Sequence, residues 1–442
     1  MKSLKLLLRF ATVGGLILLL LIPLTMIRGT IQERERYRDQ AMHRVSQSRA
    51  GEQSLIGPVR VLPWTQQREV EVTDARGLRK TELQTERGYE LQMPRRLKVD
   101  GKMRPDERRI GLFRVPVYSW HAQVLAEFDD SEYPAVEGRS YGQPYLALGI
   151  ADVRGLVGTP NLRVDGRALN LQAGSGALEA SSKGLHAPLR PLADSTQGRI
   201  DDGRKVELEF VLDGTRSLSV VPLGDDTRVT IDSPWPHPLF GGSFLPYERV
   251  VDDNGFKAEW AISSLASAAQ TQLRHDLIGD AMVESLNVAL VDPVDVYTQT
   301  DRASKYGILF VLLTFVGFVL FELIKRLRIH PLQYLLVGLA LAIFFLLLLS
   351  LSEHIAFWQA YAVSALACIG LQAFYLSGVL HSWKRAGGFA AMLTALYGVL
   401  YGLLVSENNA LLMGSLMLFG ILAAIMWVTR KVDWYELGSS LR

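Results

Sequence analysis

The apolar residues of this 442-residue chain are concentrated near its two ends. One apolar run covers residues 6–27, and five more follow a long polar stretch. The five later runs are Tyr306–Ile324, Leu332–Ser352, Trp358–Leu380, Gly388–Val405 and Ala410–Val428. A helix needs about 20 mostly apolar residues to cross the hydrocarbon core of a bilayer. The pattern therefore predicts six membrane-spanning helices, with a large water-soluble domain between the first and the second.

The first run also resembles a secretory signal, because Lys2, Lys5 and Arg9 precede it. A cleaved signal ends at a small-residue site of the Ala-x-Ala type. This run ends instead at Ile22–Arg28, which contains no such site. We therefore predict an uncleaved signal anchor, and a removed signal peptide is the alternative.

The short flanks of the predicted spans differ in their content of lysine and arginine. Basic residues lie before the first span and after the second, fourth and sixth, at Lys2, Lys5, Arg9, Lys325, Arg326, Arg328, Lys384, Arg385, Arg430 and Lys431. The loops at residues 353–354 and 406–409 contain none. Lysine and arginine accumulate in cytoplasmic loops. The bias predicts a multi-pass membrane protein with both termini in the cytoplasm and the large domain outside the membrane, in a periplasm-like compartment.

The chain is thus expected to contain four parts. They are a signal-anchor helix (1–28), an exported β-rich domain that opens with a short helix (29–304), a five-helix transmembrane bundle (305–429) and a cytoplasmic tail (430–442). The expected fold class is a polytopic α-helical membrane protein with a large, mainly-β exported domain.

Alternating apolar and polar residues indicate strands throughout the exported domain. Examples are Lys205–Leu212 and Ser217–Val221, and Asp-Gly turn signals such as Asp100-Gly101 and Asp213-Gly214 separate such segments. Half-buried strands with frequent turns are typical of antiparallel sandwiches and barrels. The charged stretch before them is expected to be a helix that ends near Gly51. One β lobe or two would both fit this pattern.

The composition restricts the candidate functions. The net charge of +2 gives no indication of a nucleic-acid partner, and the one cysteine, Cys368, lies within a predicted span, so we expect no disulfide in the exported domain. The sequence lacks a phosphate-binding loop and a His-Glu-x-x-His motif, and its eight histidines are scattered. We therefore predict a protein that is not an enzyme and uses neither metal nor cofactor. Its expected partners are the lipid bilayer and an envelope component or periplasmic protein, and its oligomeric state stays open.

The densest local pattern surrounds Trp235 and His237, between three prolines. Prolines fix an extended backbone, so this segment could present an indole and an imidazole to a ligand. The alternative is structural: a stiff connector whose tryptophan fills the β core.

The second candidate is Glu353 with His354, at the outer end of the third span. Ionisable groups at a membrane surface can relay protons or hold a cation, although they also commonly end a helix at the water boundary. None of the predicted spans carries a charge near its centre, which argues against an ion-coupled transporter.

Almost the whole chain resembles the CreD family of bacterial inner-membrane proteins. The stretches that carry the resemblance are Leu21–Leu24, Ile27-Arg28, Leu55–Pro58, Leu218–Pro222, Trp235–Pro238, Gly242–Pro246, Thr300–Tyr306, His330–Leu339, Ala340–Leu351, Ser352–His354 and Asp433–Tyr435. The middle of the exported domain and the last two spans match least.

The resemblance implies a role in cell-envelope integrity, with induction through a two-component system and an association with β-lactam responses and colicin tolerance. It implies no catalytic residue. Our first hypothesis is a non-enzymatic protein whose exported domain binds or senses an envelope component. A transporter or channel component is the second hypothesis, and an envelope hydrolase is the third.

Overall fold

The structure is a computed structural model of the chain. It describes residues 2–73, 79–178, 183–275, 283–291, 296–325, 330–379, 382–405 and 410–430. The chain forms two compact units. The helical unit contains residues 1–39 and 294–442, and the β unit contains residues 40–293.

Helix α1 (Lys2–Ser48) contributes residues to both units. The expected helix beyond the first span is confirmed, because α1 continues from the apolar run through the charged residues to Ser48. Within the helical unit, a stripe of apolar side chains is buried, namely Leu20, Leu24, Ile27 and Ile31. Residues three and four apart share one helix face, so this stripe is the side of α1 that packs on the bundle.

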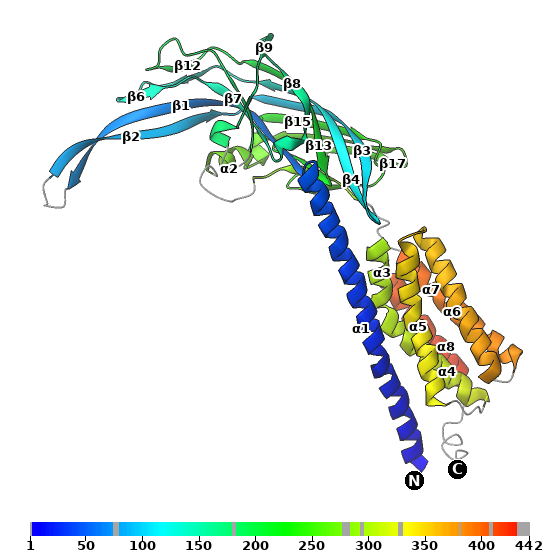
Figure 1. Cartoon of the computed structure of the whole chain (residues 1–442). Helices are drawn as coiled ribbons and strands as arrows, with labels where there is room; N and C mark the ends of the chain where they lie inside the picture. Colours follow the sequence, from blue (N-terminus) through cyan, green and yellow to red (C-terminus); the bar gives the residue numbers. More distant parts are fainter. Residues whose placement is uncertain are drawn as a thin grey trace. The chain divides into compact units, whose positions relative to one another are not determined.

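The helical unit contains six more helices in the described part of the chain. They are α3 (Val296–Lys305), α4 (Gly307–Lys325), α5 (Pro331–Ser352), α6 (Phe357–Val379), α7 (Trp383–Val405) and α8 (Ala410–Thr429). Helix α5 packs against α3, α4 and α6, and α6 packs against α7 (Figure 1). The bounds of α4–α8 agree with the predicted apolar runs to within about five residues.

The prediction of six spans is not confirmed. By length and composition, four helices of the described chain can cross a membrane: residues 11–48 of α1, and α5, α6 and α7. A fifth span results if Gln299–Lys305 and Gly307–Val319 are counted together, because they meet at a bend of 45°.

The β unit contains nineteen strands in the described part of the chain. The first ten are β1 (Gln53–Thr73), β2 (Arg79–Gln92), β3 (Arg96–Ile110), β4 (Phe113–Glu127), β5 (Ser131–Tyr133), β6 (Arg139–Tyr141), β7 (Tyr145–Ile150), β8 (Leu156–Val164), β9 (Arg167–Leu169) and β10 (Gln172–Ala173). The others are β11 (Gly184–Pro188), β12 (Gly198–Ile200), β13 (Lys205–Thr215), β14 (Ser217–Val220), β15 (Asp226–Ser233), β16 (Pro238–Gly242), β17 (Glu248–Asp252), β18 (Gly255–Ser263) and β19 (Leu286–Leu290). Helix α2 (Ala269–His275) also belongs to this unit.

These strands form two large sheets and one small one. The nine-stranded sheet has the order β10-β11-β7-β1-β14-β19-β16, with β2 and β6 also paired to β1. The eight-stranded sheet has the order β17-β18-β15-β3-β4-β13-β8-β9, and β5 pairs with β12. Most pairs are antiparallel, as expected, and the two parallel ones join β1 to β14 and β3 to β15.

The two large sheets share one hydrophobic core. Phe240 of the nine-stranded sheet meets Phe256 and Trp260 of the eight-stranded sheet, with ring centroids 5.6 and 5.9 Å apart. Trp120 and Trp260 are almost fully buried in this core. Two large sheets around a single core form a sandwich, which is one of the two architectures, sandwich or barrel, that the alternating pattern predicts. The β residues belong to one compact unit, so of the two arrangements left open the structure contains one lobe.

The hairpin of β1 and β2 is longer than the sheet that contains it. The two strands pair from Arg60 with Gln92 to Thr73 with Arg79, whereas β6 and β7 pair with β1 only as far as Gln66. Beyond that residue the two strands continue as a ribbon (Figure 1).

The end of α1 is held in the β unit by a group of polar residues that we call the junction cluster: Arg49, Gln53, Asp152, Arg154 and Asp213. Arg154 donates hydrogen bonds to the backbone oxygens of Gln47 (2.6 Å) and Ser46 (3.3 Å), which are among the last carbonyls of the helix. Asp152 accepts from Arg154 Nε at 2.8 Å. Arg49 Nη2 donates to Asp213 Oδ2 at 2.6 Å. A cation beside exposed terminal carbonyls stabilises the helix end.

The junction cluster makes stability depend on pH. The hydrogen bond from Arg154, with a smaller contribution from the backbone amide of Gly51, lowers the pKa of Asp152 from 3.8 to about 2. A carboxyl with a lowered folded-state pKa stabilises the fold fully above its unfolded pKa, and this contribution is lost as the pH falls through the folded pKa. We expect Asp152→Asn to cost about 1–2 kcal/mol at pH 7 and almost nothing near pH 2.

Chemical unfolding of the unaltered chain and of the Asp152→Asn variant across this pH range measures the difference. A difference in stability that stays constant from pH 7 to pH 2 would contradict the role given to the carboxylate. Asp253→Asn is the matched control, because Asp253 is an exposed carboxylate in the turn between β17 and β18.

Candidate functional site

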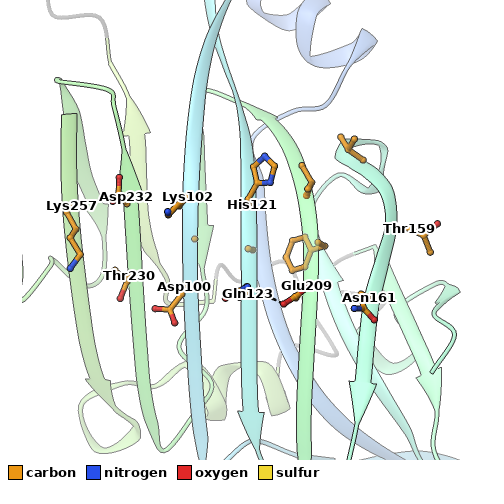
Figure 2. Close-up of a pocket in the computed structure, with 15 residues that line it drawn as sticks. Asp100, Lys102, His121, Gln123, Thr159, Asn161, Glu209, Thr230, Asp232 and Lys257 are labelled. Atoms are coloured by element: carbon orange, nitrogen blue, oxygen red, sulfur yellow. Dashed lines mark hydrogen bonds between the residues drawn. The ribbon is translucent and has the colours of Figure 1, made fainter. Parts of the chain in front are cut away.

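The solvent side of the eight-stranded sheet carries two rows of polar side chains, which we call the polar face. The strand register aligns them across neighbouring strands. The first row contains Lys257, Asp232, Lys102 and His121, and the second contains Thr230, Asp100, Gln123, Glu209 and Asn161 (Figure 2). Side chains directly opposite on neighbouring strands share one face of a sheet, so both rows project to the same side.

The residues between these positions point into the core. Ile231, Ala122 and Phe210 are buried, and Phe210 meets the ring of Trp120 edge-on, with centroids 5.7 Å apart. The side chains of these strands therefore alternate with a period of two residues between a buried face and a solvent-exposed face.

The polar face is hollowed. Its side chains surround an open depression of about 740 Å³. Gly101 lies at the floor, where a Cβ would be 1.9 Å from Nε1 of Trp120, so the strand has no room for a side chain there. The volume lies within the range of small-molecule and cofactor sites.

The depression has charges of both signs. Lys102 and Lys257 contribute cations, and the carboxylates of Asp100, Asp232 and Glu209 contribute anions. Gln123 Nε2 donates to Glu209 Oε1 at 3.1 Å, which orients that pair. Such a surface can bind an extended polar or zwitterionic ligand through several weak contacts.

The side chains that line this depression also bear on its possible chemistry. Its lining includes His121 and three carboxylates but neither serine nor cysteine. Within the described ranges, no group of three or more metal-ligating side chains is close enough to hold an ion.

The Trp235 segment is the connection between β15 in one large sheet and β16 in the other. Trp235 Nε1 lies 3.1 Å from the backbone oxygens of both His237 and Val291, and the indole packs against the core. His237 is exposed. The structure thus gives the two candidates different surroundings: Trp235 is partly buried and anchors the crossover, whereas His237 is exposed to solvent.

Glu353 and His354 also lie in different surroundings. The Glu353 side chain is 6% exposed and accepts a hydrogen bond from the Tyr297 hydroxyl at 3.1 Å, and its Oε1 is 3.6 Å from Arg34 Nε. The His354 ring is exposed, with Nδ1 at 3.0 Å from the backbone oxygen of Ser350. The pair does not form one site.

Glu353 belongs to a set of contacts that we call the α1 clasp, formed by Arg28 and Arg34 of α1 with Tyr297, Asp301 and Glu353. Asp301 Oδ1 is 3.9 Å from Arg28 Nε. All five residues lie in the helical unit. On α1 the apolar stripe ends at Ile31, and basic residues continue the contact with α3 and with the end of α5.

Sequence reasoning did not find the polar face or the α1 clasp. For the polar face a signal exists, since Asp100 and Lys102, and likewise His121 and Gln123, occupy alternate positions of their strands. The turns expected at Asp100-Gly101 and Asp213-Gly214 are wrong, because both pairs lie inside strands, β3 and β13. The alternation shows which residues of a strand point outward. It does not determine how strands that are distant in the sequence pair with one another.

These features together define a membrane protein that contains a helical unit and a large β-sandwich unit with a polar face. The family model of the inner membrane protein CreD matches residues 5–435. The chain belongs to the CreD family of inner membrane proteins. It is 38% identical to the inner membrane protein CreD of Escherichia coli K12 over 432 residues, which cover 97% of this chain and 93% of that protein.

A solved structure that also matches is the M1 zinc metallopeptidase of Deinococcus radiodurans. The match covers 48% of this chain and 53% of that one, at 8% identity and a TM-score of 0.22. At this TM-score the likeness carries no argument about fold or function.

Proposed function

We propose that the chain is a non-enzymatic inner-membrane protein that supports envelope integrity and the response to envelope stress or β-lactams. In this proposal both termini are cytoplasmic, the β unit is periplasmic, and its polar face binds an envelope component. Membership of an inner-membrane family supports the location, and the distribution of lysine and arginine supports the orientation.

The polar face is the observation that carries the proposal. It is a preformed, hollowed surface on a sheet, and it combines cations, carboxylates and amides. Its lining offers no serine or cysteine nucleophile. Binding sites generally are concave and largely preformed, and a few polar groups set their orientation.

The test replaces three charged residues that meet in the first row: Lys102→Ala, Asp232→Ala and Lys257→Ala in one chain. Each is exposed, so folding should be almost unaffected. We expect the affinity for the envelope component to fall by about tenfold or more, which corresponds to about 1.4 kcal/mol of lost binding. Survival under β-lactam stress of a strain that depends on this protein should fall as a result. Plating efficiency at equal protein levels measures the effect.

The matched control is Arg199→Ala with Asp201→Ala, an exposed ion pair away from the depression whose side chains are both 64% exposed. This control should complement fully. Full complementation by the triple variant as well would reject the polar face as the functional surface.

A transporter or channel component is the alternative function. The buried carboxylate of Glu353, at the end of a helix that can cross a membrane, is the feature that favours it. Ion or solute flux in proteoliposomes that Glu353→Ala abolishes would establish this function. Its main support would disappear if the purified chain carried no flux.

A further inference from the structure

A second pocket lies on the nine-stranded sheet, in strands that do not form the polar face. It has a volume of about 340 Å³, and its lining includes Tyr89, Gln143, Tyr145, His186 and Pro188. Among the lining residues there is no lysine, arginine, aspartate or glutamate. The pocket is therefore polar without being charged, and it is at the small end of the range for ligand sites.

The strand register explains why these side chains meet. Pro188 of β11 lies opposite Tyr145 of β7, and His186 is two residues before Pro188 on the same side of its strand. Tyr145 lies opposite Val61 of β1, and Tyr89 of β2 lies opposite Pro63, two residues further along β1. All of them project from one face of the sheet.

The ring of His186 is held in place. Its Nδ1 lies 2.7 Å from the backbone oxygen of Gly174, and its ring meets Tyr145 edge-on with centroids 5.8 Å apart. A carbonyl oxygen can only accept, so Nδ1 carries a proton, and in the tautomer that carries this proton alone Nε2 is an acceptor. In the part of the chain that the structure describes, no partner is assigned to Nε2.

Two further contacts fix the pocket wall. The Tyr145 hydroxyl accepts a hydrogen bond from the backbone amide of Ala177 at 2.9 Å. Gln143 Nε2 donates to the backbone oxygen of Leu189 at 2.7 Å, which orients its amide and leaves Oε1 as the second acceptor of the pocket. Tyr89, whose side chain is 50% exposed, forms the outer wall.

We propose that this pocket binds one neutral pyranose ring of an envelope glycan. A pyranose has an apolar C–H face that can lie on a tyrosine ring, and its edge carries hydroxyl donors. Those donors match Nε2 of His186 and Oε1 of Gln143, and the lack of charged lining residues favours a neutral ligand over a phosphate or a carboxylate. The pocket and the polar face lie on different sheets, so either assignment can fail without the other.

Saturation-transfer NMR on the detergent-solubilised full chain tests the proposal. The probes are the β-1,4-linked disaccharide of N-acetylglucosamine and, separately, cellobiose, which is the same linkage without acetamido groups. We expect saturation of ring C–H protons in at least one of them. Stronger saturation transfer to the N-acetylglucosamine disaccharide indicates a glycan of amino sugars. Equal saturation transfer to the two disaccharides indicates that the pocket recognises the pyranose ring alone.

Tyr89→Ala should weaken binding by about two- to tenfold, whereas Tyr89→Phe should retain it, because stacking needs the ring and not the hydroxyl. His186→Phe preserves the ring contact and removes the acceptor, so it should also weaken binding. Tyr247→Ala is the matched control, since Tyr247 is another exposed tyrosine of the β unit. The proposal is overturned if neither disaccharide shows saturation transfer, or if Tyr89→Ala binds as well as the unaltered chain.

Discussion

Replacing Gly155 with valine is expected to destabilise the β unit by about 3 kcal/mol, at the upper end of overpacking effects. A Cβ at this position would lie 2.2 Å from the backbone oxygen of Asp213, 2.4 Å from Gln53 Nε2 and 3.1 Å from Ala50 Cβ. The first contact is with backbone, which cannot rotate away. The second displaces the amide of Gln53, which donates to the backbone oxygens of Asp152 and Asp213 at 2.9 Å each.

Thermal unfolding of the purified full chain, followed by tryptophan fluorescence, measures this effect. For a domain of this size, 3 kcal/mol corresponds to a fall in Tm of about 6–12 °C. The matched control is Gly241→Val, because a Cβ there meets only Asn287 Oδ1 at 3.8 Å. An equal fall in Tm for both variants would show that the junction cluster is not tightly packed.

The second large effect is expected from Glu353→Ala, which should destabilise the helical unit by about 1.5–3 kcal/mol. The substitution removes the acceptor of the Tyr297 hydroxyl and the partner of Arg34. The carboxylate is almost buried, so water weakens its hydrogen bond from Tyr297 and its ion pair with Arg34 only a little. The Arg34 side chain is 41% exposed and can regain hydration, which limits the loss.

A double-mutant cycle of Glu353→Ala with Arg34→Ala isolates the ion pair, and thermal denaturation in detergent supplies the four stabilities. We expect a coupling of about 0.5–1.5 kcal/mol, since one partner is partly exposed. His354→Ala is the control and should change stability by less than about 0.5 kcal/mol, because that ring is exposed. Strict additivity of the two alanine substitutions would contradict the α1 clasp.

The sequence predicts the elements of this fold better than their assembly. The apolar runs place α5–α7 to within about five residues, because hydropathy depends on neighbouring residues alone. The start of α5 has a local signal as well, since His330 and Gln333 form a capping box around Pro331. The alternating segments likewise give strands such as β13.

The break between α3 and α4 is harder to foresee. The apolar run that begins at Tyr306 is long enough for a span, but the chain bends by 45° where α3 meets α4. Gly307 lies at that bend, and a Cβ there would be 3.2 Å from the ring of Phe345. The bend thus lies where two helices come into close contact, and the apolar pattern of a single helix does not predict such a contact.

The candidate sites show the same limit. The sequence singles out Glu353 as an unusual residue, yet its partner Arg34 lies 319 positions earlier in the chain (353 minus 34), on the helix that precedes the β domain. The polar face likewise requires β15 to pair with β3 in parallel, a contact between residues 130 positions apart, as in Asp226 with Arg96. Local patterns do not determine pairings of this kind.

The ribbon of β1 and β2 has a further consequence. In the described chain β2 pairs with β1 alone, so its other side is an open row of backbone donors and acceptors. Unprotected edges of this type recruit foreign strands and lead to aggregation. Lys80, Glu86 and Arg87 place charges of both signs along this edge. These charges keep the ribbon in water and disfavour its aggregation with other strands. A strand that adds to this edge must carry charges complementary to them.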